Sequence, residues 1–164
     1  MIDRRDPPVV AEEKEMLVAF LDYHRDTLIG KLEGLDDEQL RRRLVPSETT
    51  ILGVVKHLAY VERGWFQRTF LVDMTLERGR SEDDPDADWR IGPDESTEAI
   101  VDLYRAEVAK GRAIIEAAAF EDLAKRSDRR YTLRWIVAHM IEETARHNGH
   151  VDILRELIDG SVGE

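Results

Sequence analysis

The chain has 164 residues, a formal net charge of −11 and no cysteine. Its length is enough to bury a sizeable core, and we expect residues 1–164 to form a single domain. The acidic balance argues against a basic nucleic-acid-binding face, and the lack of cysteine excludes disulfides, thiolate metal sites and a thiol nucleophile within the chain.

Hydrophobicity along the chain gives no sign of a membrane protein. No apolar run approaches the roughly 18 residues that a membrane-spanning helix needs. The segment Met1–Pro8 lacks the apolar stretch of a signal peptide. We therefore expect a cytoplasmic protein with no membrane and no nucleic-acid partner.

The first helix is predicted over residues 10–32, where apolar residues recur at helical spacing. His24 lies on this apolar stripe. Two interpretations of it remain open, a core histidine satisfied by a neighbour or a residue that faces a polar pocket. The acidic residues 36–38 that follow predict a polar link.

The second helix is predicted over residues 51–70, with His57 at the edge of its apolar face. From there the imidazole can either reach a cavity between helices or stay half-exposed and inert. Gly64 costs a helix about 1 kcal/mol relative to alanine, so we expect another element or a ligand to approach it closely.

Residues 71–95 are polar and acidic, and glycine and proline interrupt them. They predict a solvated crossover rather than an acidic metal-binding loop, because the spacing of an EF-hand is absent. Trp89 and Ile91 are expected to anchor part of this segment to the helices. A connection of this length is uncommon unless it crosses a bundle or covers a site.

Two further helices complete the pattern. One is predicted over residues 98–120, and the last is capped by Thr132, runs to about Ile158 and ends at Gly160. No segment has the period of a strand. The sequence therefore predicts an all-α fold, a four-helix bundle with a long crossover between its second and third helices.

The last helix carries the strongest candidate for chemistry. Glu143 and His147 are four residues apart, so both can point at one spot beside the apolar stripe, with His139 and His150 flanking them. A carboxylate and an imidazole that face inward need a partner. The residues alone leave two partners open, a divalent metal or a buried ion-pair network.

His57 is the best further ligand on the second helix, which gives the set His57, Glu143 and His147. Histidine and carboxylate ligands suit zinc, nickel or ferrous iron. Three protein ligands leave positions for water or substrate, as in catalytic rather than structural sites. Such a metal could activate water, as in a hydrolase, or hold a substrate thiolate.

Two segments, Leu52–Trp65 (LGVVKHLAYVERGW) and Glu142–Arg155 (EETARHNGHVDILR), resemble the DinB-like superfamily. The similarity is strongest to its uncharacterised branch, which is related to the mycothiol-dependent maleylpyruvate isomerase metal-binding domain. It covers nearly the whole chain, including Leu21–Arg25.

The resemblance implies a helical bundle, often a homodimer, with zinc or nickel held by His57, Glu143 and His147. Much of the superfamily has histidine where Glu143 stands, and the isomerase-like branch has glutamate. His24 and His150 are pocket candidates. Relatives act as transferases or isomerases that hold an external low-molecular-weight thiol as thiolate. The alternative is a non-catalytic, stress-related binding module in which the metal is structural.

Overall fold

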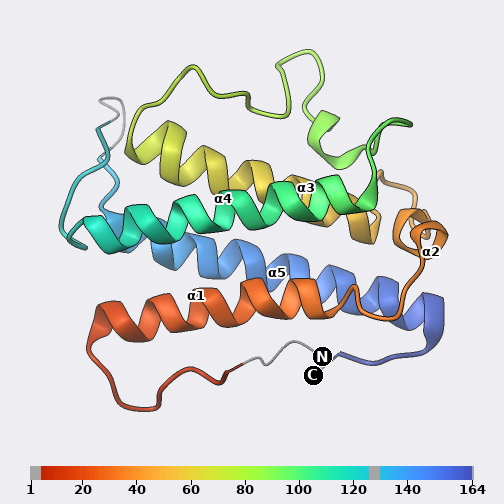
Figure 1. Ribbon diagram of the computed structural model, residues 1–164, viewed down its shortest axis with the longest axis horizontal. Helices are drawn as coiled ribbons and strands as arrows, with labels where there is room; N and C mark the ends of the chain where they lie inside the picture. Colours follow the sequence, from red (N-terminus) through yellow and green to blue (C-terminus); the bar gives the residue numbers. More distant parts are fainter. Residues whose placement is uncertain (1–4, 126–129, 164) are drawn as a thin grey trace.

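The computed structural model describes residues 5–125 and 130–163, and this part of the chain is all-α (Figure 1). In chain order the helices are α1 (Glu13–Gly30), α2 (Asp37–Arg41), α3 (Ile51–Glu62), η1 (Arg63–Phe70), η2 (Ala87–Trp89), α4 (Thr97–Ala117) and α5 (Leu133–Asp159). The described residues form no strand, and their one isolated β-bridge joins Leu123 and Thr132. The predicted all-α fold is confirmed.

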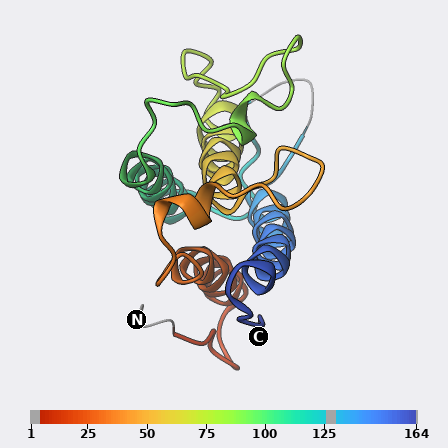
Figure 2. The same ribbon diagram turned by 90° about the vertical axis from the view of Figure 1, so that its right-hand side faces the viewer.

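The long helices α1, α3, α4 and α5 pack side by side, and the end-on view of Figure 2 places them around a common interior. In Figure 1, α1 and α5 run in one direction and α3 and α4 run in the other. Because α3 and α4 are parallel, residues 71–96 must return along the length of the bundle before α4 begins. This geometry accounts for the long crossover that the sequence predicts.

Side-chain caps fix where three of these helices begin. Thr50 accepts a hydrogen bond from the Gly53 amide, Ser96 from Ala99 and Thr132 from Trp135. These bonds satisfy backbone donors that have no partner inside the helix. At the other end of α5, Gly160 adopts φ 77°, the left-handed conformation that ends many helices.

The structure differs from the sequence-based expectation in three places. The first helix begins at Glu13 rather than near residue 10, because Val9 and Val10 are exposed and have no core to join. Asp36 and Gln39 form a reciprocal capping box that starts the short helix α2, where a polar link was expected. Residues 63–70 continue α3 with π-helical hydrogen bonds instead of α-helical ones.

The interior holds two apolar clusters. One surrounds α3 and α4 and includes Leu52, Val55 and Leu58, and the other surrounds α5 and η1 and includes Phe66, Ile136 and Met140. Burial of these side chains supplies most of the driving force for packing the helices. None of the helices formed by described residues is long and apolar enough to cross a membrane.

A buried ion pair joins α1 to α3. The Nε and Nη2 atoms of Arg25 donate to the two carboxylate oxygens of Glu62 at 2.8 and 2.7 Å, and both side chains are 1% exposed. Burial lowers the pKa of Arg25, but the charge of Glu62 and its hydrogen bonds outweigh that effect and raise the pKa, so the guanidinium stays charged. Gly111 of α4 leaves room for the pair, because a Cβ there would lie 2.9 Å from the Glu62 Oε2 atom.

Replacement of Glu62 by glutamine should destabilise the protein by about 3–5 kcal/mol, because it leaves Arg25 buried beside a neutral amide. Chemical denaturation measures the loss. The matched control is Glu121→Gln, which removes the exposed ion pair with Arg134 and should cost less than about 1 kcal/mol. Similar losses for both variants would contradict a structural role for the buried pair.

Candidate metal centre

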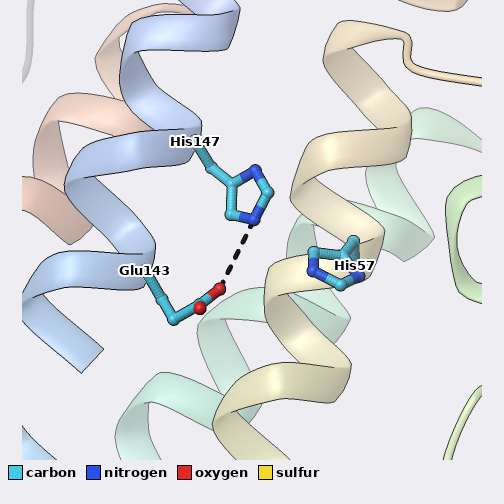
Figure 3. A group of neighbouring side chains, drawn as sticks. All are labelled: His57, Glu143 and His147. Atoms are coloured by element: carbon cyan, nitrogen blue, oxygen red, sulfur yellow. Dashed lines mark ion pairs between the residues drawn. The ribbon is translucent and has the colours of Figure 1, made fainter. Parts of the chain in front are cut away.

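Three potential metal ligands from distant parts of the sequence meet between α3 and α5. His57 lies on α3, and Glu143 and His147 lie one turn apart on α5 (Figure 3). One ligand atom of each side chain lies within 4.8 Å of the other two. His57 and His147 are buried, and Glu143 is partly buried. The structure thus brings together the set that the sequence predicts.

The separation of Glu143 and His147 suits two ligands of one cation. The Nε2 atom of His147 lies 3.5 Å from the Oε2 atom of Glu143, which is long for a charge-assisted hydrogen bond. Two ligands at zinc-to-ligand distances of about 2.0–2.2 Å in a tetrahedral site lie roughly 3.3 Å apart. The donor set and this spacing therefore fit a divalent cation.

The crossover fixes the orientation of His57. Its Nδ1 atom lies 2.9 Å from the Oδ2 atom of Asp88, which is buried, and its ring stacks on Trp89 with centroids 4.0 Å apart. The carboxylate favours the tautomer that carries its proton on Nδ1. The Nε2 lone pair is then left for a cation, as in the carboxylate–histidine pairs of metal sites.

His147 has an equivalent partner in His150. Their Nδ1 atoms lie 3.2 Å apart, and a proton on Nδ1 of His147, donated to His150, leaves Nε2 of His147 for a cation. Burial lowers the pKa of His147 to about 4, and the charges of His57, His150 and Arg146 add to the effect. At neutral pH the imidazole is therefore in the unprotonated form that binds metal.

Gly53 allows the crossover to reach the site. A Cβ at this position would lie 2.5 Å from the backbone oxygen of Trp89 and 2.9 Å from the Oγ1 atom of Thr50. Only glycine leaves space for Trp89 against the first turn of α3. The small residue at position 53 therefore helps to set the positions of Asp88 and Trp89 at His57.

The remaining histidines lie in three different settings. His150 is exposed beside His147. His139 stacks on Trp135 with centroids 5.0 Å apart, and its Nε2 atom lies 3.8 Å from Glu143. The ring of His24 contacts Tyr23, and the clusters of potential metal ligands found among the described residues do not include it.

Two expectations about α3 and the crossover need correction. The expected close approach of another element to Gly64 is wrong, since no atom of another element lies within 4 Å of the position that a Cβ would take, although Gly64 does line a cavity. Asp88 was assigned to a solvated crossover but is 2% exposed and bonded to His57. Its neighbour Trp89 was correctly expected to anchor the crossover to the helices. That expectation could also have indicated that the adjacent carboxylate is buried.

A sequence model of the mycothiol-S-transferase family matches residues 16–160. The chain belongs to this family. The assignment confirms the DinB-like resemblance, because this is a DinB-like family, and it indicates a metal-dependent transferase that uses a thiol.

A solved structure described as a conserved protein of locus from Enterococcus faecalis is similar in fold, with a TM-score of 0.66. It is 14% identical in sequence, and the match covers 93% of this chain and 100% of that one. At this identity the likeness supports the fold alone. A comparison with curated proteins gives no match.

Replacement of Gly53 by alanine should destabilise this mycothiol-S-transferase family member, because the new methyl group meets the Trp89 carbonyl. Helix propensity alone would favour alanine by about 1 kcal/mol, so a loss identifies the steric conflict. The control is Gly149→Ala on α5, where nothing lies within 4 Å and a gain of about 1 kcal/mol is expected. Chemical denaturation of both variants makes the test, and stabilisation by both would contradict it.

The metal-free protein should lose stability as the pH falls from about 6.5 towards 4, in part through His147. Between these values the unfolded chain protonates this imidazole and the folded chain does not, so the free energy of unfolding decreases as the pH is lowered. The measurement compares urea unfolding of the wild type and His147→Gln at several pH values. Identical pH slopes for the two proteins would contradict the lowered pKa.

Proposed function

We propose that this protein is a metal-dependent S-transferase that activates a low-molecular-weight thiol, mycothiol in the first instance, at a centre formed by His57, Glu143 and His147. The observation that carries the proposal is the convergence of these three side chains in a chain that belongs to the mycothiol-S-transferase family. The lack of cysteine means that the reacting thiol comes from outside the chain.

The donor set suits zinc, with nickel or ferrous iron as alternatives. When bound, a divalent cation lowers the pKa of a coordinated thiol, so that thiolate is available at neutral pH. Glu143 is the one anionic residue of the set, because His57 and His147 contribute neutral imidazoles. The set therefore leaves net positive charge at the centre, which favours a thiolate over a neutral thiol.

Neighbouring residues fix the orientation of the two histidine ligands. Asp88 and His150 accept the Nδ1 protons of His57 and His147, so both imidazoles present Nε2. Trp89 covers one face of the His57 ring and limits the access of water from that side. In the transfer, sulfur bonds to the electrophilic carbon, the leaving group departs with its bonding electrons, and the thiol proton passes to solvent.

Substitution of His57, Glu143 or His147 by alanine should abolish stoichiometric metal binding, measured by elemental analysis of the purified protein. Thiol conjugation by these variants should fall at least about 100-fold, since the cation is expected to contribute several kcal/mol. His24→Ala is the matched control and should keep both properties, because His24 lies outside the cluster.

Two results would contradict the proposal in different ways. Full metal content in the His147→Ala variant would show that the metal does not depend on the proposed centre. Metal binding by the wild type without conjugation of any thiol to a panel of electrophiles would leave a structural metal and support the alternative of a binding module. The homodimer and the cytoplasmic location expected from the sequence stay predictions.

A further inference from the structure

A cavity of about 380 Å³ lies beside the candidate metal centre, between η1 and the crossover. Two residues of its wall connect it to the metal centre. Asp88, on its wall, is bonded to His57. The ring of Trp65, also on its wall, contacts His139, which in turn lies near Glu143. A molecule in this cavity would therefore be next to the ligands.

The charge of the cavity wall is opposite to that of the chain. The protein has a net charge of −11, yet the wall carries Arg68, Arg78 and Arg80 against the single acidic residue Asp88. Arg68 donates to the backbone oxygens of Met74 and Leu76 and so braces the crossover. Arg78 and Arg80 form no ion pair or hydrogen bond with the described part of the chain. Two guanidinium groups are thus left to bind an anion.

The positions of these two arginines are fixed by the glycine between them. Gly79 has φ 73° and lies directly on the ring of Tyr60, where a Cβ would overlap the ring atoms. A residue other than glycine would be strained and would be pushed off the ring. This contact holds Arg78 and Arg80 beside the cavity rather than free in the crossover.

The other walls suit a flat molecule. Trp65 and Tyr131 meet edge to face, with ring centroids 5.3 Å apart, and both line the cavity together with Tyr60. At the end near the metal centre, the buried Oδ1 atom of Asp88 has no hydrogen-bond partner among the described residues. A donor group on a bound molecule would satisfy that oxygen.

We propose that this cavity binds a planar, unsaturated or aromatic organic carboxylate, with its carboxylate on Arg78 and Arg80 and its flat part between Trp65, Tyr131 and Tyr60. The inference rests on the proposed function, and it makes the cavity the site for one of the two substrates. Guanidinium groups are well matched to a carboxylate because they offer paired donors in one plane. The substrate in the cavity is the electrophile, because the thiol is held at the metal centre.

Binding is tested by NMR titration of the full chain, treated with chelator so that no metal can attract the ligand. The probes are benzoate and its neutral analogue benzamide. Benzoate should bind at least about tenfold more tightly, and the double variant Arg78→Ala/Arg80→Ala should remove that advantage. Arg90→Ala removes one charge from the same crossover but not from the cavity wall, and it should retain the preference. Equal affinities for the two probes, or a preference that survives in the double variant, would overturn the inference.

Kinetics with the metal-loaded protein test whether the electrophile occupies the cavity. The electrophiles are 4-chloro-3,5-dinitrobenzoate and its amide, and the thiol is mycothiol. A fall in kcat/KM of the double variant confined to the charged electrophile is expected. Equal falls with charged and neutral substrates would overturn the inference. No conjugation at all would contradict the S-transferase function but leave the binding result to stand by itself.

Discussion

The parallel course of α3 and α4 is the constraint on which the site depends. Two helices that run the same way need a connection that returns along the bundle (Figure 1), and here Asp88 of that connection is bonded to His57. The crossover therefore does more than join helices. Its residues Asp88 and Trp89 hold the imidazole by a hydrogen bond and a stacked ring, and Gly53 gives them the space to do so.

The interior near the site contains two kinds of polar group. Arg25 and Glu62 satisfy each other by two hydrogen bonds and so fix α1 against α3. His57, Glu143 and His147 converge without a comparable set of mutual hydrogen bonds, and each imidazole uses its Nδ1 atom on a different neighbour. An ion pair whose two partners satisfy each other's hydrogen bonds stabilises the fold. Three side chains that converge with free lone pairs are instead suited to bind a cation.

Local patterns were sufficient to predict the all-α fold, the cap at Thr132 and the Glu143–His147 pair, because each depends on residues close in sequence or on the face of one helix. The choice of His57 as the third ligand, from another helix, drew on the resemblance to the DinB-like superfamily as well. What could not be predicted depends on contacts between distant segments. The burial of Asp88 follows from the path of the crossover, and the partner of Glu62 lies on another helix. The capping box of α2 was readable in the sequence and was missed.

The proposed function requires that His57 and the Glu143–His147 pair share one cation. Anomalous diffraction at the zinc edge, from crystals grown without chelator, tests it directly. We expect a single strong peak within bonding distance of the Nε2 atoms of both histidines and of the Glu143 carboxylate. A peak that excludes His57, or a metal bound elsewhere on the chain, would contradict it.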